Sequence, residues 1–68
     1  MKIGDQIQVQ IKGGDTGLTL GNPDGSSIKI GPGASMSVSG VITADLGTEW
    51  EVRLNMSIDG KNLIKVLK

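Results

Sequence analysis

Hydrophobic and polar residues alternate with a period of two along most of the chain. In residues 6–12, QIQVQIK, the apolar residues Ile7, Val9 and Ile11 are separated by glutamines. In an extended strand, this alternation places all apolar side chains on one face. The pattern therefore predicts a β-strand over residues 6–12 with one face buried and the other in solvent.

The same alternation recurs in five further segments, and turn residues separate them. The segments are residues 16–20, 27–30, 35–43, 47–59 and 62–68. Glycine, proline and aspartate gather between them, and these residues favour turns. Turn signals spaced by about ten residues are typical of an all-β barrel or sandwich. We therefore expect one all-β domain over residues 1–68, a small six-stranded antiparallel barrel or sandwich that is oligomeric.

Two details of the pattern predict local structure. Gly40 interrupts the alternation before Val41 and Ile42, which indicates a bulge or a bend in that strand. The segments GLTLG at 17–21 and SIKIG at 27–31 resemble each other, and a proline-containing loop follows each. A β-helix or spike-like stack is therefore the alternative architecture, although such repeats need about three copies to be stable.

Trp50 is the only aromatic residue of the chain and lies at the start of a strand. Alternation places it on one face with Val52, Leu54, Met56 and Ile58, which is the pattern of a core. Tryptophan is also enriched at the centres of protein interfaces, and its ring is a surface on which a ligand can stack. Core residue, subunit interface and ligand platform all remain open at this stage.

The last predicted strand, NLIKVLK at 62–68, carries apolar residues on both faces. Ile64 and Val66 lie on one face, and Leu63 and Leu67 lie on the other. An ordinary edge strand has one face in water. This strand therefore either crosses the centre of the fold or presents its second face to another subunit, because an exposed apolar edge promotes aggregation.

Composition points to self-association as the missing source of stability. A chain of 68 residues buries only about 60% of the surface of its unfolded form. Small domains usually add disulfides, a metal or oligomerisation. Cysteine and histidine are both absent, as are phenylalanine and tyrosine, so disulfides and thiolate metal sites are excluded. We expect a homo-oligomer that shares its core between copies.

The same absences argue against catalysis. There is no Ser/His/Asp or Cys/His set, and the pair Glu49 and Glu51 on one strand face is typical of solvated surface. Asp24 and Asp59 stand in glycine turns without the repeating acidic pattern of a calcium loop. We therefore expect no enzyme, no catalytic residue, no cofactor and no metal.

Charge and hydropathy limit the partners. Seven basic and seven acidic residues give a net charge of zero, whereas nucleic-acid binding depends on clustered lysine and arginine. No apolar run approaches the roughly 20 residues of a membrane span, and the first ten residues lack the apolar centre of a signal peptide. We expect no nucleic-acid partner, no membrane partner and no signal peptide.

The stretch DGSSIKIGPGASMSVSGVI combines short glycine- and serine-rich strands with the absence of cysteine and histidine. In this texture the chain resembles, over about residues 15–58, small all-β bacteriophage virion proteins of the capsid-decoration or capsid-stabilisation type. The resemblance implies a homo-oligomer, with a trimer favoured, that sits on a capsid shell and is found in the virion or the cytoplasm. The residues expected at buried or interface contacts are Trp50, Met36, Met56, Leu63 and Leu67.

The alternative is a small viral or bacterial inhibitor or sequestering protein that binds a host protein or a small ligand. Such proteins are also short, β-rich and oligomeric. A nucleotide-binding surface would need converging arginine or aromatic side chains, and Arg53 and Trp50 are single examples of each type.

Overall fold

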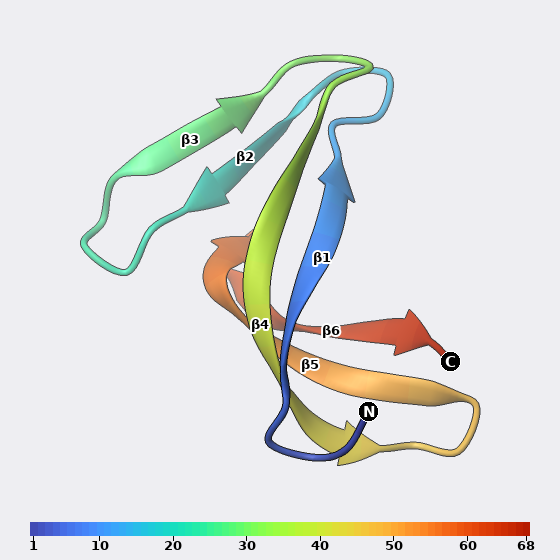
Figure 1. Ribbon diagram of the computed structural model, residues 1–68. Coiled ribbons are helices and arrows are strands. Elements are labelled where there is room, and N and C mark those ends of the chain that lie inside the picture. Colours follow the sequence, from blue (N-terminus) through green and yellow to red (C-terminus); the bar gives the residue numbers. More distant parts are fainter.

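The computed structural model describes residues 1–68 and contains six strands in one antiparallel sheet (Figure 1). The strands are β1 (Gln6–Lys12), β2 (Leu18–Gly21), β3 (Ser27–Ile30), β4 (Ser35–Asp45), β5 (Glu49–Ile58) and β6 (Lys61–Leu67). The predicted all-β class is confirmed. The sheet curls into a half-barrel, so the barrel-like alternative is closer than a sandwich of two sheets. No helix is present that has the length and apolar character to cross a membrane.

Strands that are distant in the sequence pair with each other. The order across the sheet is β1-β4-β5-β2-β3, and β6 pairs with β5. The second part of β4, from Gly40 to Asp45, pairs with β5, and Gly40 lies opposite Leu54. The first part of β4, from Ser35 to Val41, pairs with β1. The far end of β5 pairs with β2, where Ile58 lies opposite Leu20. Figure 1 shows β4 as the long curved strand that connects β1 to the part of the sheet that contains β5 and β6.

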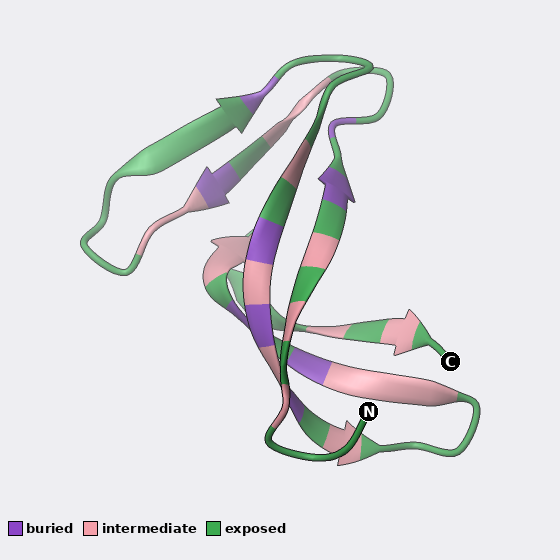
Figure 2. Cartoon of the chain, in the orientation of Figure 1, coloured by how far each residue is buried: buried purple, intermediate pink, exposed green.

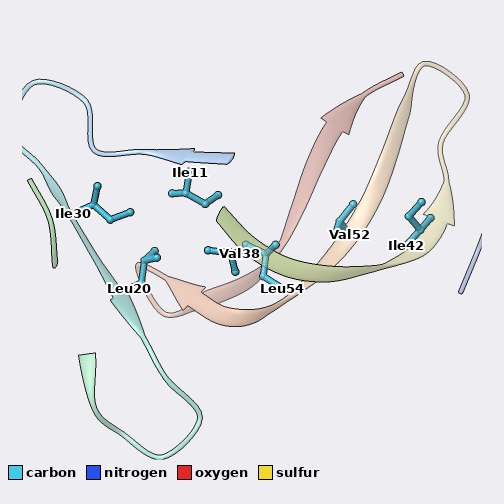
Figure 3. Packing of buried hydrophobic residues seen from close by; sticks show 7 residues of the cluster. All are labelled: Ile11, Leu20, Ile30, Val38, Ile42, Val52 and Leu54. Atoms are coloured by element: carbon cyan, nitrogen blue, oxygen red, sulfur yellow. The ribbon is translucent and has the colours of Figure 1, made fainter. Parts of the chain in front are cut away.

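The period of two places one apolar set of each strand on the inner face of the curled sheet. Across β1 and β4, Val9 lies opposite Val38 and Ile11 lies opposite Met36. Seven side chains form the buried core: Ile11, Leu20, Ile30, Val38, Ile42, Val52 and Leu54. Figure 3 shows them spread in a row from Ile42 to Ile30. Nine further apolar residues pack against this row and remain partly exposed.

Gly40 allows a close approach between strands. Of the bulge or bend predicted there, the bulge is wrong. The register between β1 and β4 is unbroken, and the irregularity lies between Ile42 and Ala44, where β4 pairs with β5. A Cβ at position 40 would lie 2.7 Å from Val52 Cγ1 and 3.0 Å from Arg53 O. The glycine is required because β4 and β5 meet there without room for a side chain.

Two of the predicted turns form as their residues indicate. In the β2–β3 loop, Asp24 Oδ1 accepts hydrogen bonds from the Ser26 amide at 2.9 Å and from its hydroxyl at 2.6 Å. These bonds lower the pKa of Asp24. Between β5 and β6, Asp59 and Gly60 both have positive φ, 52° and 75°, as a two-residue hairpin turn requires.

The β1–β2 loop lies directly on the β3–β4 loop. Gly13 N donates to Ala34 O at 2.9 Å, and Gly33 N donates to Gly14 O at 3.0 Å. A side chain on Gly13 would collide with the carbonyl of Gly31. This contact holds the β2–β3 hairpin against the end of the β1–β4 pair and helps to cover that end of the core.

Candidate functional site

The five predicted contact residues lie on two different faces of the sheet. Trp50, Met36 and Met56 are half-buried on the inner face and pack against the core. Leu63 and Leu67 lie on the outer face of β6 and are 48% and 78% exposed. The prediction that β6 has two apolar faces is confirmed. β6 does not cross the centre of the fold, because it pairs only with β5.

Trp50 lies at the rim of the core, where β4, β5 and β6 meet. It is directly opposite Asp45 on β4 and Val66 on β6. The Lys68 ammonium lies 4.2 Å from the centroid of the ring, close enough for a cation–π interaction. A ligand that stacked on this side of the ring would have to displace Lys68.

Lys68 links the end of β6 to the β4–β5 turn. Its Nζ forms an ion pair with Asp45 Oδ1 at 2.5 Å, and its backbone N donates to Thr48 O at 3.1 Å. The hydrogen bond from Lys68 and a second from the Gly47 amide lower the pKa of Asp45. The sequence gives no local signal for this cluster, because Asp45 and Lys68 meet only through the registers of β4, β5 and β6.

Three strands pair with a neighbour on one side only, along their whole length. β1 pairs only with β4, β3 only with β2, and β6 only with β5. The other edge of such a strand presents backbone N–H and C=O groups that can pair with another chain. These edges leave backbone groups unpaired, and the half-covered inner face leaves apolar side chains partly in solvent.

The surface hollows offer little chemistry for a small ligand. The largest, of about 510 Å³, lies at the base of the β2–β3 hairpin beside the β5–β6 turn, and Lys29 and Asp59 are its charged side chains. No group of three or more potential metal ligands lies together. On the outer face, the Glu51 carboxylate accepts a hydrogen bond from Thr43 Oγ1 at 3.2 Å, which engages one member of the Glu49/Glu51 pair.

Comparisons of the chain with protein-family models, with curated proteins and with solved structures found no match.

Proposed function

We propose that this chain is a small structural subunit that assembles with copies of itself and decorates or stabilises a larger assembly such as a bacteriophage capsid. One observation carries the proposal: the apolar inner face is only partly covered. Seven hydrophobic residues are buried, and nine more lie around them half in solvent. Figure 2 shows the buried positions in the middle of β4 and β5 and near the ends of β1, β2 and β3, with intermediate and exposed positions around them.

Association would recover stability that the single chain leaves unused. Complete burial of one valine, leucine or isoleucine side chain is worth about 1.5–3 kcal/mol relative to exposure. Trp50, Met36 and Met56 are only half-buried, so the single chain gains only part of the free energy that their complete burial would give. Disulfides are excluded because the chain has no cysteine, and oligomerisation is a common source of stability for chains of this size.

The outer face offers a second surface for the larger assembly. Leu63 and Leu67 are large hydrophobic residues that the single chain leaves exposed. Each contact with a shell would be modest, but many copies held together on one lattice bind far more tightly than one. The capsid as the larger assembly follows from the resemblance of residues 15–58 to phage virion proteins.

The mass of the purified protein by light scattering after size exclusion tests the homo-oligomer, with Trp50 emission recorded on the same peak. The proposal expects a closed homo-oligomer with blue-shifted emission, and the resemblance implies three copies. A folded monomer with red-shifted emission at all accessible concentrations contradicts the proposal. That result would favour the inhibitor or sequestering protein instead.

A further inference from the structure

The three free edges differ in how far they are protected against pairing. β3 has four residues and carries Lys29. β6 carries Lys61 and Lys65 within its seven residues. β1 also has seven residues, but no charge, proline or glycine precedes Lys12 at its end. Natural sheets protect exposed edges with charges, prolines, bulges or short strands, so β1 is the least protected of these three strands.

The sequence of β1 is nearly the same in both directions from Val9. The neighbours of Val9 are Gln8 and Gln10, and the next residues outward are Ile7 and Ile11. Two antiparallel copies related by a two-fold axis at Val9 would place Ile7 opposite the partner's Ile11. The same axis would place Gln8 opposite the partner's Gln10. No like charges meet, because Lys12 falls opposite Gln6, which is uncharged.

β6 lacks this property. A two-fold axis at Lys65 would bring Leu63 opposite the partner's Leu67, but it would also place Lys65 opposite the partner's Lys65. Like charges directly opposite each other on one sheet face are destabilising. A two-fold axis at Ile64 or at Val66 places Lys65 opposite a leucine of the partner. None of these three axes pairs apolar residues with each other and also keeps Lys65 away from both a like charge and an apolar residue.

The backbone of β1 points the required groups outward. Ile42 N donates to Asp5 O at 3.0 Å, and Gly13 N donates to Ala34 O at 2.9 Å. These bonds flank a ladder of unbroken register, and bonding in an antiparallel ladder alternates from residue to residue. The odd-numbered residues therefore bond to β4. The N–H and C=O groups that point away from β4 belong to Gln6, Gln8, Gln10 and Lys12.

The two-fold axis at Val9 also satisfies these outward groups. In an antiparallel pair, residues directly opposite each other either exchange both hydrogen bonds or exchange none. The axis pairs Gln8 with the partner's Gln10 and Gln6 with the partner's Lys12, so outward-pointing residues meet outward-pointing residues. Side-chain order helps too: Gln8 Nε2 donates to Ser39 Oγ at 2.8 Å, which reduces the ordering cost of association.

We infer that the outer edge of β1 is the contact between copies of this chain. Residues 6–12 of two copies pair antiparallel about Val9 and form one continuous sheet whose apolar faces lie on the same side. The inference deepens the proposed function and rests on its homo-oligomer. A two-fold contact gives an even number of copies, in place of the trimer that the resemblance implies, because a three-fold ring would need β1 to meet a different edge.

Residue-resolved amide hydrogen exchange tests the pairing directly. In the oligomer, the amides of Gln8 and Gln10 exchange as slowly as those of Val9 and Ile11, because the partner strand protects them. On dilution to the monomer, Gln8 and Gln10 become fast while Val9 and Ile11 stay slow. If light scattering shows an oligomer in which Gln8 and Gln10 exchange freely, the β1 contact is wrong and the proposed function stands. If the protein is a folded monomer throughout, both are wrong.

A pair of matched double variants tests the register. Gln8→Lys with Gln10→Lys places two lysine pairs across the axis and should weaken association about tenfold, since each such pair is unfavourable. Gln8→Glu with Gln10→Lys removes the same glutamines but places opposite charges across the axis, and it should associate at least as well as the wild type at low salt. Equal dissociation of both variants, with unchanged monomer unfolding, would overturn the Val9 register.

Discussion

The middle and the ends of β5 have the same pattern and very different burial. Val52 is 0% exposed and Leu54 is 2% exposed. Trp50 and Met56 lie on the same face two residues further out and are only half-buried. Figure 2 shows this change along the strand, from pink at the start to purple and back to pink at the end.

The difference shows how far a sheet of this size can close on itself. The middle of β5 has a strand on each side, and Val52 lies between Ile42 on β4 and Ile64 on β6. Trp50 lies opposite Asp45, the last residue of β4, and Met56 has no partner in any ladder of the sheet. A half-barrel of six strands therefore completes a core at its centre and leaves an apolar rim that is partly exposed.

The largest expected effect separates the middle of β5 from its rim. Leu54→Ala should lower the free energy of unfolding by about 2–5 kcal/mol, because a fully buried leucine leaves a cavity. Met56→Ala should cost clearly less, since part of its side chain is already in solvent. Urea unfolding followed by circular dichroism measures both, at one protein concentration because association adds to apparent stability. Equal losses would remove the distinction between middle and rim.

A second substitution tests why the middle closes. Gly40→Ala should cost about 1–3 kcal/mol by overpacking, because its Cβ would lie 2.7 Å from Val52 Cγ1 and 3.0 Å from Arg53 O. Gly31→Ala is the matched control, since a Cβ there meets nothing within 4 Å. Thermal unfolding of the two variants should separate them. A neutral Gly40→Ala would mean that β4 and β5 can part without cost.

The rim should respond to acid through Asp45. Its pKa is lowered in the folded state, so the ion pair with Lys68 stabilises the fold above the usual aspartate value of 3.8. This contribution disappears as the pH falls through the lower, folded-state pKa. Trp50 emission should change over that range, because Lys68 lies on its ring. Asp45→Asn should remove the transition, and an unchanged acid transition in that variant would assign it to another group.

The smallest effect is expected on the outer face. Leu63→Ser and Leu67→Ser should change monomer unfolding by no more than about 0.5 kcal/mol, as is usual for exposed positions. If the outer face binds a larger assembly, the same substitutions should weaken that binding without changing the mass of the homo-oligomer. A loss above about 1 kcal/mol in monomer unfolding would show that β6 is packed more closely than its exposure indicates.

Local chemistry made much of this fold predictable from the sequence. The alternation in residues 6–12 and 27–30 predicts β1 and β3 with the bounds that the structure has. The two faces of β6 and the turns at Asp24 and Asp59 also follow from the sequence, because each depends on residues within a few positions of each other. The shared face of Trp50 and Met56 follows from the sequence for the same reason.

The tertiary structure decided which strands meet. Any amphipathic strand can pair with any other, so the alternation does not distinguish β4 from β2 as the neighbour of β1. The pairing determines which edges are free and brings Lys68 onto Trp50. It also places the register irregularity after Ile42 and not at Gly40. Half-burial of Trp50 has the same origin: its face is a property of the strand, but its cover comes from segments far away in the chain.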